Sequence, residues 1–168
     1  CEWQTIYDGE TPQRVKITGG NGGPGKVEIE VDGRRIDDLR SPNTTFVEGK
    51  KIRVHFKQDE PRPGEPEPLL GGFTGVTVER GVGPGALMGT IHLELRPCEW
   101  HTVFSLSAKA CIRVVNSGGI NPQPLEVEVD GARKDDLTVG NAAQYEGRTV
   151  RVHGKGGDTA LVSIEPCR

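Results

Sequence analysis

Apolar and polar residues alternate along several short stretches of this 168-residue chain. Val27, Ile29 and Val31 alternate with acidic residues, and the same alternation recurs in residues 51–56 and 90–95. A period of two is typical of a strand that buries one face, and no window shows the 3.6-residue period of a helix. The pattern predicts an all-β protein of short antiparallel strands.

The alternating pattern occurs twice along the chain. Residues 27–56 align with residues 125–154 at a constant offset of 98, with 15 identical residues in 30 positions. The letters CEW begin at Cys1 and again at Cys98, and LELRPC, which ends at Cys98, resembles VSIEPC near the end of the chain. Matches of this kind in the same order predict a tandem duplication.

Turn residues divide each repeat into strands. Each repeat has an Asp-Gly and a Glu-Gly pair at matching places, which are residues 32–33, 48–49, 130–131 and 146–147. Asp-Gly favours a two-residue hairpin turn, because both central residues need a positive φ, and Glu-Gly predicts a second turn. We expect two tandem, internally duplicated β-sandwich units of immunoglobulin-like architecture, over residues 1–97 and 98–168.

The cysteine count is even, at four, which is typical of a chain that folds in an oxidising compartment. Cys98 ends one repeat and begins the next, and this double position predicts a disulfide between Cys1 and Cys98. Cys111 and Cys167 would then form a second disulfide. Two alternatives stay open: Cys167 bonds to Cys1 of the next molecule, with a short internal Cys98–Cys111 bridge, or Cys1 carries a lipid.

Aspartates cluster around the hairpin of each repeat. The cluster contains the side chains of Asp32, Asp37, Asp38, Asp130, Asp135 and Asp136. Oxygen ligands near a turn suit Ca²⁺, but the run lacks the ligand ladder of a calcium-binding loop. The simpler interpretation is that these carboxylates cap backbone N–H groups of the turn. Apart from this calcium alternative, the sequence predicts no cofactor.

Tryptophan occurs at two positions, Trp3 and Trp100, which correspond in the two repeats. A tryptophan two residues after a cysteine is expected to pack over a disulfide in the core. The alternative is an exposed platform on which the face of a sugar stacks. His55 and His153 also correspond, and strand alternation turns them away from the core of their own unit.

A net charge of −3 gives no reason to expect binding to nucleic acid or anionic lipid. No stretch approaches the length and hydrophobicity of a membrane span. We find no nucleophile motif, phosphate-binding loop or zinc spacing, so the sequence predicts a protein that is not an enzyme. The cysteines favour a secreted, extracellular or cell-surface location.

The repeats differ most in residues 57–90, where the first carries a long insertion and the second a short connection. A proline-rich polar arm leads into an apolar stretch, and a loop this long is uncommon without a function. We expect it to pack on its own molecule, on a partner chain or over a ligand pocket. The predicted partner-contact residues are Leu69, Leu70, Phe73, Val76 and Val78. Asn43 begins a glycosylation sequon.

Together these features predict a secreted, non-enzymatic interaction protein. The preferred hypothesis is a subunit of an extracellular assembly, such as a fibre, sheath or adhesin, that contacts other protein chains, including its own copies, through residues 57–90. The alternatives are an extracellular module that binds carbohydrate or another ligand, and a secreted protease inhibitor that presents residues 61–70.

Overall fold

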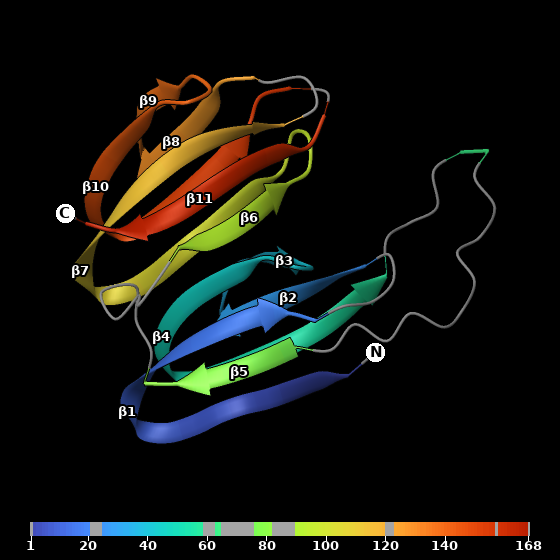
Figure 1. The fold of residues 1–168 in the computed structure, drawn as a ribbon. Helices are drawn as coiled ribbons and strands as arrows, with labels where there is room; N and C mark the ends of the chain where they lie inside the picture. The colour runs from blue at the N-terminus through green and yellow to red at the C-terminus, as the bar shows by residue number, and fades with distance from the viewer. Residues whose placement is uncertain are drawn as a thin grey trace.

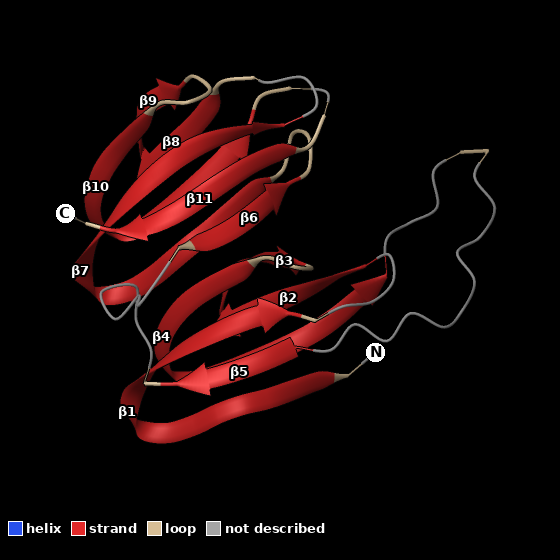
Figure 2. Cartoon of the chain, in the orientation of Figure 1, coloured by secondary structure: helices blue, strands red, loops and turns tan. Residues whose placement is uncertain are grey.

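The computed structural model describes residues 2–20, 25–58, 63–64, 76–81, 90–119, 123–156 and 158–167. Within these residues every regular element is a β-strand, as Figure 2 shows. The prediction of an all-β protein is confirmed. No helix long and apolar enough to cross a membrane is found in the described part of the chain.

The described strands fall into two halves, which lie one above the other in Figure 1. The first half contains β1 (Trp3–Gly19), β2 (Gly25–Val31), β3 (Arg34–Arg40), β4 (Thr44–Gln58) and β5 (Val76–Arg80). The second half contains β6 (Ile91–Leu95), β7 (Trp100–Gly119), β8 (Leu125–Val129), β9 (Ala132–Leu137), β10 (Ala142–Gly154) and β11 (Ala160–Pro166).

The hairpins of the two repeats match in detail. β2 and β3 are joined by Asp32-Gly33 with φ angles of 50° and 80°, and β8 and β9 are joined by Asp130-Gly131 with the same two φ values. Both central residues therefore lie in the left-handed region, which Asp tolerates and Gly adopts freely. The predicted two-residue hairpin turns are confirmed.

The Glu-Gly pairs do not form turns. Gly49 lies inside β4 and Gly147 lies inside β10, and these strands are 15 and 13 residues long. A Cβ at Gly49 would overlap the Cγ1 atom of Val31 at the tip of the hairpin. The glycine is needed where the long strand passes close to the hairpin, so the prediction of a second turn, and of uniformly short strands, is wrong.

Long strands let each half form two facing layers. In the first half β3 pairs with β2, and β2 pairs with the end of β4, while β5 pairs with the end of β1, which itself pairs with the start of β4. The apolar side chains of Val15 and Ile17 on β1 and of Val27 and Ile29 on β2 meet in one core between the layers. A second core fills the other half.

The last strand of the first repeat is not the one suggested by the sequence, whereas that of the second repeat is. β5 pairs with β1 in the register Val15↔Arg80, and β11 pairs with β7 in the corresponding register Ile112↔Pro166. VTVER of β5 therefore takes the place of VSIEP of β11. The LELRPC segment instead supplies β6, which pairs with β11 in the second half, so LELRPC and VSIEPC are not equivalent strands of the two repeats.

The two halves meet where β4 runs parallel to β7, through the pairs Phe46↔Phe104 and Val47↔Ser105. Phe46 comes from the first half, but its side chain is 1% exposed and belongs to the core of the second half. Burying a phenylalanine across the junction stabilises it by roughly 2–3 kcal/mol. The two halves thus share one hydrophobic core at this point.

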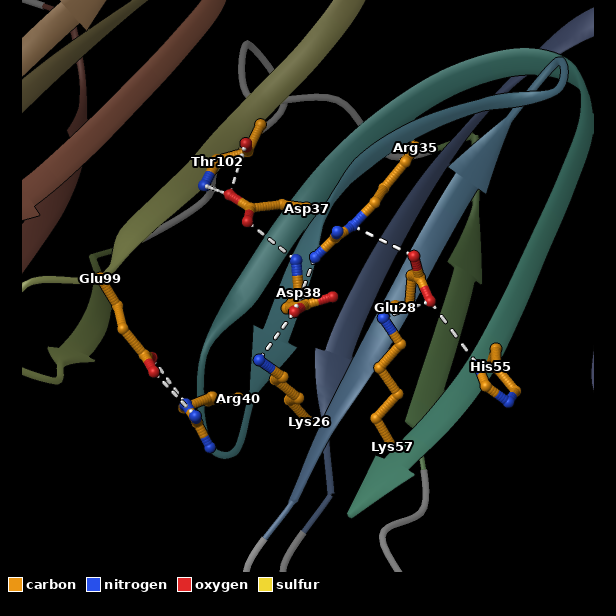
Figure 3. A network of polar contacts seen from close by, with 10 residues as sticks. All are labelled: Lys26, Glu28, Arg35, Asp37, Asp38, Arg40, His55, Lys57, Glu99 and Thr102. Carbon is orange, nitrogen blue, oxygen red and sulfur yellow. Dashed lines mark hydrogen bonds and ion pairs between the residues drawn. The ribbon is translucent and has the colours of Figure 1, made fainter. Parts of the chain in front are cut away.

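Two charged side chains of β3 reinforce the junction, as Figure 3 shows. Arg40 is 9% exposed, and its guanidinium donates to both carboxylate oxygens of Glu99, over 2.6 and 2.7 Å. The Oδ2 atom of Asp37 accepts hydrogen bonds from the backbone N–H and the hydroxyl of Thr102, each 2.7 Å long. Charge-assisted hydrogen bonds in a partly buried site are stronger than neutral ones, so these pairs fix the relative orientation of the halves.

Asn43 joins the first half to β6. Its side-chain amide donates to the carbonyl of Glu94 and accepts from the N–H of Glu94, both over 2.8 Å. The side chain thus pairs with a strand edge as another strand would, and Asn43 is only 3% exposed. A glycan on Nδ2 would displace the bond to Glu94, so the folded chain leaves no room for glycosylation at this sequon.

Replacing Asn43 by alanine tests this contact. N43A leaves the N–H and carbonyl of Glu94 without their partner, and we expect the free energy of unfolding to fall by about 2 kcal/mol. The matched control is N141A at the corresponding position of the second repeat, where the exposed amide bonds only to Thr138 Oγ1. The control should cost about 0.5 kcal/mol or less. Equal losses in urea unfolding would contradict the role of Asn43.

His101 makes the junction sensitive to pH. The ring is fully buried, which lowers its pKa below the ordinary value of 6.5. Its Nε2 lies 2.9 Å from the carbonyl oxygen of Thr44 and donates to it. The unfolded chain takes up a proton near pH 6.5, whereas the folded chain keeps this ring neutral to lower pH. Stability is therefore lost as the pH falls from about 6.5 towards the lowered folded pKa.

The variant H101Q carries the residue that the first repeat has at the same place, Gln4. At pH 7.5 we expect it to be less stable than the wild type by about 1 kcal/mol, since one buried hydrogen bond is weakened. Between pH 7 and pH 5 the wild type should lose stability and the variant should lose less. Parallel urea-unfolding curves across this range would show that His101 is not the titrating group.

Candidate functional site

The first tryptophan lies on the outer face of the first half. The ring of Trp3 stacks on His55 with centroids 5.1 Å apart, and the guanidinium of Arg53 lies 4.9 Å from the ring centroid. His55 and Arg53 are two residues apart on β4 and share one face of the strand. Opposite them on β2 are Glu28 and Glu30, which pair with these side chains.

The second repeat has the same arrangement. Trp100 stacks on His153 with centroids 4.9 Å apart, and Arg151 lies 5.0 Å from the Trp100 ring centroid. Neither tryptophan belongs to a core cluster, and Trp3 is 36% exposed. The expectation that these rings lie in the core is wrong, because both stack on outward-facing side chains of the neighbouring strand. Whether a disulfide lies beside them is not tested, since Cys1 falls outside the described residues. Their role as ligand platforms stays a prediction.

The aspartates at the hairpin tips cap backbone groups. Asp32 Oδ1 accepts from the N–H groups of Lys50 and Lys51, and Asp130 Oδ1 accepts from those of Arg148 and Thr149. The bond from Thr149 is the main reason that the pKa of Asp130 is lowered. These contacts clamp the hairpin against the bend of the long strand, and the turn-capping interpretation is confirmed for both residues.

The paired aspartates of the first repeat serve the junction and the sheet surface. Asp37 bonds to Thr102, as described above, and Asp38 forms ion pairs with Lys26 and Arg35, at 2.9 and 2.8 Å. Burial would raise the pKa of Asp38, but the two cations outweigh it and the pKa is lowered. The side chain therefore stays ionised in this network, which Figure 3 shows.

The paired aspartates of the second repeat also have protein partners. Asp135 accepts from the hydroxyl of Tyr145 over 3.3 Å, and Asp136 pairs with Arg133 and Lys155. In the described residues no group of three or more His, Cys, Asp or Glu side chains converges to hold a metal ion. The calcium alternative therefore gains no support from how these carboxylates are placed.

One predicted disulfide is present, between Cys111 and Cys167, with Cα atoms 5.7 Å apart. The alternative bridge from Cys98 to Cys111 is therefore wrong. Cys98 is exposed and forms no disulfide with the described residues. Cys1 lies outside the described residues, so the Cys1–Cys98 disulfide, the link between molecules and the lipid stay predictions.

The insertion in the first repeat is only partly described. Val76 and Val78 lie on β5, where both are partly buried against the core of their own half, and their predicted role as partner contacts is not tested. β5 therefore has the same place in the first half as β11 has in the second half. Leu69, Leu70 and Phe73 fall outside the described residues, and their predicted role is not tested.

A cleft of about 670 Å³ lies between the two halves. The first half contributes the start of β3, at residues 34–36, and the second half contributes parts of β7, β8 and β10 and the turn that contains Asp130. A volume of this size is typical of pockets that take a small ligand. The cleft exists because the junction between the halves holds the β2–β3 hairpin of the first half above the outer face of the second half.

Polar and cationic groups dominate the lining. The cations are the side chains of Arg34, Arg35, Lys109, Arg148 and Arg151, and the acids are Glu128 and Asp130. Hydroxyl groups of Thr102, Ser105 and Thr149 line the cleft between them. The arrangement can donate several hydrogen bonds to one ligand, and the net charge of the lining is positive.

This cleft could not be predicted from the sequence. One signal was available at a single position, where the first repeat has Arg34 and the second has Ala132. The hairpin arginine is thus not needed for the fold of a repeat. The role of Arg34 depends on the position of the neighbouring half, and the alignment of the repeats does not reveal that position.

No family model matches this chain, and no curated protein matches it. A de novo designed double-stranded β-helix covers 45% of this chain and 95% of its own, at 17% identity and a TM-score of 0.37. YhaK from Escherichia coli covers 98% of this chain and 83% of its own, at 13% identity and a TM-score of 0.36. PA5104 from Pseudomonas aeruginosa PAO1, a conserved protein of unknown function, covers 97% and 75%, at 13% identity and a TM-score of 0.33. Similarity at this level carries no argument about ligand or activity.

Proposed function

We propose that this protein is a secreted, non-enzymatic binding module whose ligand occupies the cleft between the two halves. The observation that carries the proposal is the cleft itself, which both halves build and which the junction holds in one shape. A site formed in advance costs less conformational entropy on binding than one that must be assembled.

Other features support parts of this proposal. The Cys111–Cys167 disulfide favours an oxidising, extracellular compartment, since such bonds are rare in the reducing cytosol. His92 contacts Ser163 over 3.2 Å, but Ser163 contacts a second serine and the pair does not line the cleft, which favours binding over catalysis. Each half, with its core between two antiparallel layers, is compatible with an immunoglobulin-like sandwich, and we keep that architecture as a proposal.

An assembly subunit is the second candidate. Two similar units stack head to tail within one chain, and a head-to-tail contact can be repeated from molecule to molecule without forming a closed ring. This arrangement favours the assembly candidate. The outer ends of the stack are more polar than the junction, however. Gln144 stands where the first repeat has the buried Phe46, and Gln4 stands where the second has His101. Self-association would therefore rely on the apolar part of the insertion, at residues 69–73.

The binding proposal is tested by recording amide resonances of the labelled protein with neutral and acidic oligosaccharides. We expect at least one sugar to shift the resonances of Thr102, Ser105 and Thr149 at about 1 mM. Shifts confined to the surroundings of Trp3 and Trp100 would move the site to the tryptophan platforms. If no sugar perturbs either region, the carbohydrate-binding proposal is wrong.

The assembly candidate is tested by sedimentation at increasing concentration. If it is correct, the wild type associates, and the variant L69D/L70D/F73D stays monomeric, because charges in an apolar contact are costly to bury. The matched control is V139D, which alters an exposed apolar residue of the second half and should still associate. A wild type that remains monomeric at about 100 μM would contradict the candidate. Oligomers that disappear on reduction would instead indicate disulfide links between chains.

A further inference from the structure

We propose that the cleft between the halves binds an acidic oligosaccharide, one whose carboxylate or sulfate groups are held by Arg34 and Arg148 from opposite sides. This inference rests on the proposed binding function and adds the chemical class of the ligand.

Nearly all arginines in the described residues have an acceptor or an aromatic ring as partner. Arg35, for example, pairs with Glu28 and Asp38, and Arg133 pairs with Glu126 and Asp136. Within the described part of the chain, the guanidinium groups of Arg34 and Arg148 have no direct ion pair and no hydrogen-bond acceptor. Arg148 does act on Asp130, whose pKa is lowered first by the backbone N–H of Thr149 and also by the charge of Arg148. Both side chains are exposed, both line the cleft, and they come from different halves.

A third arginine in the cleft also lacks an acceptor. The Nε atom of Arg151 is buried without a hydrogen-bond partner, and the nearest carboxylate contact, from Nη1 to Glu128, is 3.7 Å long. Burying a donor without an acceptor is unfavourable. Because Nε is buried, a ligand in the cleft can approach only the other nitrogens of this guanidinium.

The residues that line the cleft include more cations than acids. Five cations and two acids line the cleft. Arg35 is paired with Glu28 and Asp38 outside the lining, but the other four cations still outnumber the two acids. Asp130 is already engaged with the backbone N–H groups of Arg148 and Thr149 on β10. Guanidinium groups bind carboxylate and sulfate-like oxyanions with paired hydrogen bonds, so the excess charge favours an anionic ligand.

The neutral part of the lining favours a sugar over a nucleic acid. Ser105 and Thr149 lie 3.5 Å apart, so their hydroxyls bond to each other only weakly and can bond to ligand hydroxyls. No aromatic side chain is among the described lining residues, whereas proteins that bind single strands stack bases on aromatic rings. A volume of about 670 Å³ is also larger than a single inorganic anion requires.

Calorimetry at low ionic strength tests the proposal with three trisaccharide-sized probes: an oligogalacturonate, a sulfated heparin fragment and neutral maltotriose. We expect the wild type to bind one or both acidic probes and to bind maltotriose at least tenfold more weakly. The two acidic probes distinguish carboxylate from sulfate recognition. Added salt should weaken binding, since the contacts are between charges.

The variant R34A tests the site, because alanine is the residue of the second repeat at this position and the fold tolerates it there. R34A and R148A should each weaken binding of the acidic probe about tenfold, as expected for one charge-assisted contact. The matched control R133A removes an exposed arginine of the second half that does not line the cleft, and should change the affinity less than twofold.

Several results would overturn the inference. If R133A weakens binding as much as R34A, the acidic probe is held by the general surface and not by the cleft. Equal binding of maltotriose in the cleft would leave the binding module standing but contradict its selectivity for anions. Tighter binding of a single-stranded oligonucleotide than of either acidic sugar would make the site a nucleic-acid site. If no acidic probe binds at about 1 mM, the inference is wrong.

Discussion

The parallel contact of β4 with β7 is the constraint on which the other features depend. Phe46 crosses it into the core of the second half, and Asp37, Arg40 and Asn43 each bond to a residue of the other half. Buried polar groups of this kind are costly unless every partner is in place. The halves therefore meet in one orientation, and the cleft has one shape.

The junction also explains how a duplicated sequence becomes an asymmetric molecule. The two hairpins contribute to the cleft with different residues: the first through the start of β3, and the second through its Asp130-Gly131 turn. Arg34 lines the cleft, whereas the corresponding Ala132 is not among the described lining residues. Repeats at the ends of a stack carry polar outer surfaces because nothing covers them, and Gln144 in place of Phe46 follows this rule.

Charge is distributed in two ways over the surface. On the outer sheet faces, acids of one strand lie opposite bases of the next, as Glu30 lies opposite Arg53, and such pairs are close to neutral. In the cleft, cations of both halves come together without enough acids to balance them. A positive lining between neutral faces directs an anionic ligand to one place.

The sequence by itself determined the repeated unit: alternating residues predict strands, and Asp-Gly predicts each hairpin, because these signals depend on neighbours along the chain. It did not determine that Gly49 lies within a bent strand, since that glycine is required by the side chain of Val31, nor that Ile91–Leu95 joins the second half. Tertiary structure decided those points and formed the cleft. These features depend on contacts between residues that are far apart in the chain, and an alignment of the repeats does not show how one repeat packs against the other.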